Sequence, residues 1–111
     1  MDIIKNLESM LLKGQDNALI RYSLGNEYLR ARKYATAIQH LDRAIELDPD
    51  YSAAWKLYGK ALTGNDQFNE AAKAYEKGIL VAKKRGDIQA AREMEVFLKR
   101  LKNSGKSNIV K

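Results

Sequence analysis

The chain has 111 residues, no cysteine, one histidine and a formal net charge of +6 at neutral pH. Its length suits one small domain with its own core, and the lack of cysteine excludes disulfides and thiolate metal sites. No apolar run approaches the roughly 20 residues that a membrane helix needs, and the first residues, MDIIKNLESMLLKG, do not resemble a signal peptide. We therefore expect a soluble, cytoplasmic protein.

The first part of the chain carries an apolar stripe with helical spacing. The stripe consists of Ile4, Leu7, Met10 and Leu11. It predicts a lone helix over residues 3–13, which Gly14 ends. Asp16 can then cap a second helix, which contains the stretch NALIRYSLGNEYLRA.

The next helix has a longer apolar stripe. It consists of Ala37, Ile38, Leu41, Ala44 and Ile45. The helix ends near Pro49, because proline lacks the backbone N–H and disfavours the helical conformation of the residue before it. Asp50 or Ser52 can cap the following helix, and Trp55 lies in the first turn of that helix, where we expect it to be buried.

The chain also matches itself at an offset of 34 residues without a gap. The matched pairs are Gly25 with Gly59, Tyr34 with Phe68, Ala37 with Ala71, and Ile45 with Ile79. All of them are small or apolar, and such positions are the ones where helix packing tolerates little change. The offset therefore predicts a repeated structural unit rather than two separate domains.

Residues 18–51 and 52–85 resemble the tetratricopeptide repeat, a helix–turn–helix unit of 34 residues. The stretches LGNEY, AIQHLDRAIELDP, YGKAL and AAKAYEKGI carry the resemblance, and KGQDNALIRYSLGNEYL is similar to small bacterial members of the family. The resemblance implies an all-α solenoid of about six antiparallel helices, in which each repeat has a first (A) and a second (B) helix. Half-repeats at 3–14 and 87–102 supply a lone B helix and a C-terminal capping helix.

The last helix, DIQAAREMEVFLKRLK, does not fit the strict offset, which would bury Arg92 and Glu93 at a high cost. A frame moved by two residues buries Ala91, Met94 and Leu98 instead. We expect that frame and a polar outer face, which a solenoid end needs for solubility.

One domain over residues 1–102 is thus predicted, followed by a flexible basic tail over 103–111. No catalytic or metal-binding constellation is apparent in the sequence. His40 lies outside the apolar stripe of its helix, and we expect it on the surface, where a lone histidine cannot build a usual zinc site. We therefore expect no enzymatic activity and no cofactor.

Tetratricopeptide domains usually bind a peptide or a partner helix in a concave groove lined by their A helices, so the resemblance implies groove residues here. The candidates are Tyr22, Asn26, Leu29, Arg30, Lys56, Leu57, Lys60, Arg92 and Lys99. Lys56 and Lys60 lie one turn apart on one helix face, where like charges repel, and packing does not require that arrangement. A positive groove suits an acidic protein or peptide, or a terminal carboxylate.

Some members of the family clamp the C-terminal carboxylate of chaperone tails with lysine, asparagine and arginine side chains. Asn26 fits that pattern, but Tyr22 and Leu57 stand where lysine and asparagine are expected. We therefore do not predict chaperone-tail binding.

Two other readings of the surface remain open beside the adaptor. A nucleic-acid or ribonucleoprotein accessory would use the late basic clusters, which contain Lys83, Lys84, Arg85, Lys99, Arg100 and Lys102. Those clusters lack the aromatic rings on which single-strand binders usually stack bases. A self-assembling scaffold would instead pack an end helix on a second copy. We favour a monomeric adaptor.

Overall fold

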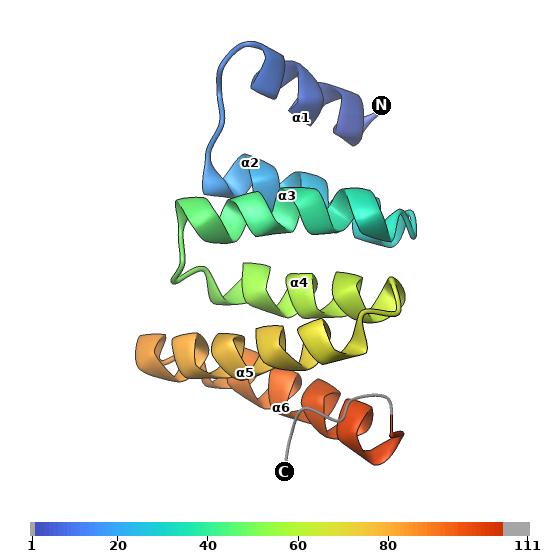
Figure 1. The fold of residues 1–111 in the computed structure, drawn as a ribbon. Coiled ribbons are helices and arrows are strands. Elements are labelled where there is room, and N and C mark those ends of the chain that lie inside the picture. The colour runs from blue at the N-terminus through green and yellow to red at the C-terminus, as the bar shows by residue number, and fades with distance from the viewer. Residues whose placement is uncertain (1, 106–111) are drawn as a thin grey trace.

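The computed structural model describes residues 2–105, and this range is entirely helices and turns. The helices are α1 (Ile3–Leu12), α2 (Ala18–Arg30), α3 (Tyr34–Leu47), α4 (Ser52–Gly64), α5 (Phe68–Arg85) and α6 (Ile88–Asn103). Consecutive helices run antiparallel and stack so that α1 and α6 lie at opposite ends of the molecule (Figure 1). This arrangement confirms the predicted all-α solenoid, with α2, α4 and α6 as A helices and α1, α3 and α5 as B helices.

The turn between an A helix and its B helix is built twice in the same way. Arg32 and Asp66 lie 34 residues apart, and both adopt the left-handed conformation, with φ values of 60° and 61°. In each turn the following backbone N–H, that of Lys33 or Gln67, donates a 2.9 Å hydrogen bond to a carbonyl in the last turn of the A helix. The sequence period therefore appears in the backbone geometry as well.

A glycine brings the two helices of each repeat close together. A Cβ atom on Gly25 would overlap the side chain of Leu41, and a Cβ atom on Gly59 would overlap the ring of Tyr75. Both large side chains are almost completely buried. Because each glycine and its neighbour are matched by the 34-residue offset, the period preserves a helix contact rather than a general composition.

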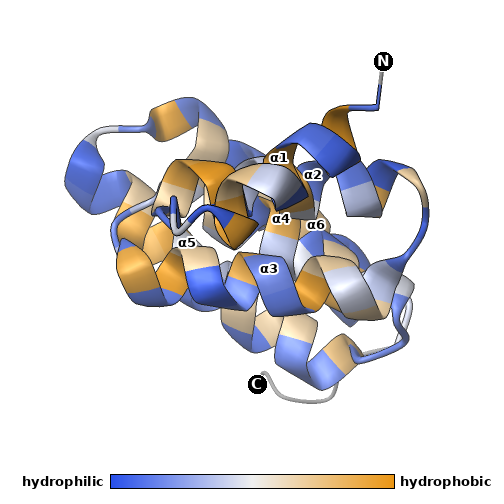
Figure 2. Cartoon of the chain, turned by 90° about the horizontal axis from the view of Figure 1, so that it is seen from above, coloured by the Kyte–Doolittle hydropathy of each residue, from blue (hydrophilic) through white to orange (hydrophobic). Residues whose placement is uncertain are grey.

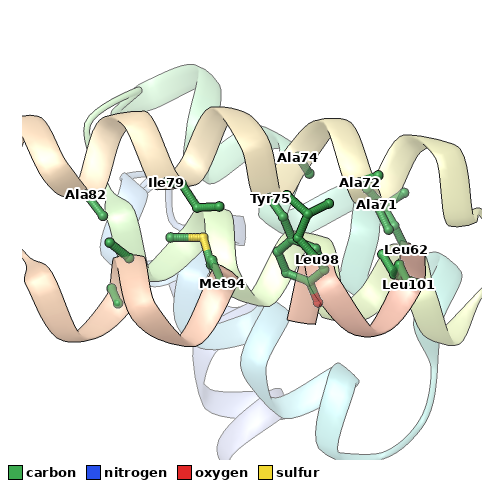
Figure 3. Packing of buried hydrophobic residues seen from close by; sticks show 12 residues of the cluster. Leu62, Ala71, Ala72, Ala74, Tyr75, Ile79, Ala82, Met94, Leu98 and Leu101 are labelled. Carbon is green, nitrogen blue, oxygen red and sulfur yellow. The ribbon is translucent and has the colours of Figure 1, made fainter. Parts of the chain in front are cut away.

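The larger part of the core lies between α4, α5 and α6. Its largest enclosed side chains are Tyr75 and Met94, and small alanines of α5 line the same interface (Figure 3). Ala91, Met94 and Leu98 are buried, as the frame shifted by two residues predicts, whereas Arg92 is exposed. Viewed from above, hydrophilic and hydrophobic residues alternate around each helix, as in amphipathic helices (Figure 2).

Helix α1 is the least buried element of the fold. None of its residues is fully buried, and among residues 2–105 its packing partner is α2. Ile4, Leu7 and Leu11 are half-buried, but Met10 is 40% exposed, so the predicted stripe is only partly covered. The reason is that α1 has a neighbouring helix on one side only. The Tyr28 hydroxyl adds a polar link, because it donates a hydrogen bond to the carboxylate of Glu8.

The structure corrects the predicted cap of α2. Asn17, not Asp16, is the N-cap, and its side-chain oxygen accepts a 2.8 Å hydrogen bond from the backbone N–H of Ile20. Asp16 instead pairs with Arg21 at 2.8 Å and lies 3.7 Å from Arg43. The Arg21 hydrogen bond holds the pKa of Asp16 below its ordinary value.

The start of α4 also differs from the prediction. Tyr51 is the N-cap and makes no side-chain capping bond, so neither Asp50 nor Ser52 has the predicted role. The Ser52 hydroxyl donates a 2.7 Å hydrogen bond to Asp87, which links α4 to the residue that caps α6. Trp55 is only partly buried and packs at the edge of the larger core cluster.

His40 is half-buried rather than fully on the surface. Its ring stacks on Tyr28, with centroids 5.5 Å apart, and its Nδ1 atom lies 3.1 Å from the Arg21 guanidinium. Burial is the larger cause that lowers the pKa of His40, and the charge of Arg21 acts in the same direction.

The predicted ends of α1 and α5 are confirmed by left-handed glycines. Gly14 has φ 84° and follows α1, while Gly86 has φ 79° and ends α5. Helix α6 reaches Asn103, one residue beyond the predicted boundary, and Ser104 follows it. The remainder of the predicted tail, residues 106–111, lies outside the described range. From the helix bounds we propose the two full repeats and two half-repeats that the sequence suggests.

Candidate functional site

A hollow of about 680 Å³ lies where the C-terminal halves of the A helices α2, α4 and α6 meet. It is lined by Asn26, Leu29, Arg30, Arg32, Tyr34, Leu57, Lys60, Thr63, Gly64, Tyr75, Phe97, Arg100, Leu101 and Ser104. Its volume falls in the range of roughly 300–1,000 Å³ that is usual for ligand sites. The hollow is therefore large enough to hold side chains of a partner.

The floor of the hollow is apolar and aromatic. Leu57, Tyr75 and Leu101 are buried, and the rings of Tyr75 and Phe97 lie 5.7 Å apart in a tilted arrangement. Burial raises the pKa of Tyr75 to about 12, so its phenol stays neutral at physiological pH. An apolar side chain that enters the hollow would meet these groups and displace water from them.

The glycine at the end of α4 shapes one wall. A Cβ atom on Gly64 would overlap the ring of Tyr34, so the absence of a side chain lets this ring lie against α4. Both residues line the hollow. The wall thus joins the start of α3 to the end of α4.

Four cationic side chains surround the floor, and the lining contains no acidic residue. The cations are Arg30, Arg32, Lys60 and Arg100. Lys60 Nζ lies 5.5 Å from the centroid of the Phe97 ring, and Arg100 Cζ lies 5.9 Å from the same centroid. Both distances fit cation–π contacts. Arg30 is 3.8 Å from Glu27 but its side chain remains 72% exposed. The hollow therefore presents positive charge above an apolar floor.

Five of the nine predicted groove residues line this hollow. They are Asn26, Leu29, Arg30, Leu57 and Lys60. Arg92 and Lys99 are exposed on α6 but lie outside the hollow lining.

The other two predicted residues, Tyr22 and Lys56, have partners of their own. The Tyr22 ring stacks on Tyr51 with centroids 4.8 Å apart. Lys56 Nζ forms a 2.8 Å ion pair with Glu93 on α6. That hydrogen bond is the main reason why the pKa of Glu93 is lowered. The charge of Lys56 is thus neutralised, and the expected repulsion between Lys56 and Lys60 does not define a common site.

Sequence reasoning missed the contribution of α6. The shifted frame aligned Lys60 with Val96, but Val96 is 47% exposed and its neighbour Phe97 lines the hollow. The spacing of Phe97, Arg100 and Leu101 could have indicated this face, because residues three and four apart share one side of a helix. The offset alone did not contain the rotation of α6.

Residues 2–105 contain no group of three or more histidine, cysteine, aspartate or glutamate side chains that could hold a metal ion. Within the same range, every helix is too short or too polar to cross a membrane.

The sequence profile of the tetratricopeptide repeat matches residues 28–94, which is more than half of the chain. The chain belongs to the tetratricopeptide repeat family. It is 48% identical over 99 residues to the TPR repeat-containing protein PA0015 of Pseudomonas aeruginosa, covering 89% of this chain and 94% of that protein.

Two solved structures show the same architecture. Protein BPP2914 from Bordetella parapertussis has 41% sequence identity and a TM-score of 0.83, covering 94% of this chain and 90% of that one. The TPR2B domain of yeast Sti1, solved as a complex with pHsp70, has a TM-score of 0.84 with 16% identity, covering 91% of this chain and 81% of the other. The second similarity is one of fold.

Proposed function

We propose that this chain is a non-enzymatic protein-interaction module that binds an extended, acidic peptide segment in the hollow of α2, α4 and α6. The observation that carries the proposal is the composition of the hollow lining, which has an apolar floor, four cations and no carboxylate. An extended peptide can place an apolar side chain on such a floor while its carboxylates accept charge-assisted hydrogen bonds from the cations.

The parallel arrangement of the A helices supports this proposal. Three helices from separate parts of the chain contribute residues from their C-terminal halves, so a ligand contacts all of them at once. The yeast Sti1 domain, which has this fold, forms a complex with pHsp70. Because that likeness concerns the fold alone, the ligand of the present chain is inferred from its own hollow.

The arrangement does not support the chaperone-tail clamp that some family members have. Tyr22 and Leu57 replace the lysine and asparagine of that clamp, and Lys56 is paired with Glu93. The free cations lie further along the A helices, at Lys60 and Arg100. We therefore propose a peptide whose internal acidic side chains, rather than its terminal carboxylate, are recognised.

Single-stranded nucleic acid is a second candidate ligand, and one observation favours it. The sequence showed no aromatic residue within its basic clusters, yet the fold brings Phe97 between Lys60 and Arg100. A base could stack on this ring while the cations contact phosphates. Phe97→Leu separates the two candidates, because leucine preserves an apolar floor but removes the flat ring.

Affinity capture with matched charge variants tests the proposal. Wild-type chain, Lys60→Glu/Arg100→Glu and Lys77→Glu/Lys99→Glu are each used to capture partners from an extract of the source cells. The second variant carries the same charge change at exposed positions outside the hollow. Bound partners are then trimmed by protease to the protected segment.

We expect an acidic protected segment that the wild type and the control variant retain and the hollow variant loses. Equal retention by all three proteins would contradict the proposal. A protected oligonucleotide, released by Phe97→Leu, would establish the second candidate instead.

A further inference from the structure

Lys60 and Arg100 come from different helices, α4 and α6, yet both lie within 6 Å of the centroid of the Phe97 ring. Two like charges around one ring repel each other, so this arrangement is not one that folding by itself favours. In residues 2–105 neither cation forms an ion pair with a carboxylate. Glu93, whose pKa Lys60 also helps to lower, has its ion pair with Lys56.

We infer that Lys60, Phe97 and Arg100 form the subsite that determines specificity, and that it selects an acidic residue two positions from a large apolar residue in the bound peptide. This inference rests on the proposed function. The apolar side chain would pack against Phe97 and the buried floor, and the carboxylate would accept hydrogen bonds from Lys60 or Arg100.

The spacing of two follows from the geometry of an extended peptide. Successive side chains point to opposite faces, and residues two apart lie on one face at roughly 7 Å. The cations lie 5.5 and 5.9 Å from the centre of the ring that would hold the apolar side chain. A carboxylate on the adjacent residue would point away from the hollow.

The same pair of cations also disfavours other ligands. A lysine or arginine at the acidic position would bring a third positive charge to Lys60 and Arg100. A neutral residue there would leave both cations without a charged partner. Specificity of this kind combines an attractive contact with the rejection of competitors.

Selection from a display library of random octapeptides tests the inference. The targets are the wild-type chain, Arg100→Gln and the matched control Lys99→Gln, which removes an exposed charge on the same helix but outside the hollow. A peptide selected by the wild type is then synthesised with blocked ends, together with an analogue in which glutamine or asparagine replaces each acidic residue. Circular dichroism verifies that every variant is folded.

The wild type and Lys99→Gln should enrich peptides with an aspartate or glutamate two positions from a large apolar residue. They should bind the acidic peptide at least about tenfold more tightly than its neutral analogue, the effect expected for a charge-assisted hydrogen bond. Arg100→Gln should still enrich apolar residues, but its preference for the acidic peptide should fall below about threefold.

An unchanged acidic preference in Arg100→Gln, or enrichment without an acidic residue at that spacing, would overturn the inference and leave the proposed function standing. If the wild type enriches no peptide over the bare support, the proposed function itself fails.

Discussion

The indole Nε1–H of Trp55 donates a 2.8 Å hydrogen bond to the carbonyl oxygen of Pro49. Pro49 lies in the turn after α3, and Trp55 lies in the first turn of α4. The bond therefore fixes the path of the chain where one repeat passes into the next. Trp55 also lies so close to Gly78 that a Cβ atom there would overlap its own Cβ. The proline marks a packed junction within one domain.

Removing this bond should have a modest effect on stability. Trp55→Phe should lower the free energy of unfolding by about 1 kcal/mol, because it loses one hydrogen bond but keeps most of the ring. Trp55→Ala should cost about 2–3 kcal/mol, less than a fully buried tryptophan, since the side chain is only partly buried. Urea denaturation measures both, with Leu80→Ala, at a 67% exposed site, as the control. Equal midpoints for Trp55→Phe and wild type would exclude a stabilising bond.

Close packing at Gly59 gives a second prediction. Gly59→Ala should destabilise the protein by about 1–3 kcal/mol, because the new methyl group overlaps the Tyr75 ring. In a Tyr75→Ala background the same substitution should cost much less, since the ring is gone. A double-mutant cycle from denaturation midpoints gives the coupling energy between the two sites. Additive effects would show that the glycine has a different role.

The sequence predicts the repeated packing well because small residues mark helix crossings. Gly25 and Gly59 could be found by self-alignment, since each must leave room for a large side chain on the facing helix. Gly14 and Gly86 could be recognised as helix ends, because left-handed backbone favours glycine. These features depend on local chemistry that one sequence displays.

Other features depend on how helices are rotated against each other. Phe97 and Val96 are adjacent, and only the packing of α6 decides which of them lines the hollow. Asp16 and Asn17 are both suitable caps, and the choice follows from the pairing of Asp16 with Arg21. About half of the candidate site was therefore predictable, and the remainder required the tertiary arrangement.

His40 should make stability depend on pH. Its Nδ1 atom faces the Arg21 guanidinium, which can only donate, so the folded protein requires the neutral ring. Burial and Arg21 lower the pKa of His40 in the folded state, while the charges of Glu8 and Asp16 partly oppose this. The unfolded chain thus binds the proton more readily, and stability should fall as pH drops through about 6.5.

Urea midpoints at pH 7.5 and 5.5 measure this effect. The wild type should lose stability between these two values, and His40→Gln should lose clearly less. Carboxylates contribute little in this window, because they titrate at lower pH. An identical pH dependence in both proteins would show that His40 is not the titrating group.

Helix α1 should open more easily than the rest of the fold. It has no fully buried residue and packs on α2 alone among the described helices. Its amides should exchange with deuterium faster than those of α5, and Tyr28→Phe should accelerate them further by removing the bond to Glu8. The α5 amides serve as the internal control. Equal protection of α1 and α5 would contradict this view of α1.

The central claim is that the hollow of α2, α4 and α6 is the binding site, and amide chemical shifts measure it most directly. The ¹⁵N-labelled chain is titrated with the acidic segment protected in the capture experiment. We predict that the largest shifts occur at lining residues such as Asn26, Gly64 and Phe97, and that Lys60→Glu/Arg100→Glu abolishes them. Shifts centred on α1 or on the outer face of α5, unchanged in that variant, would contradict the claim.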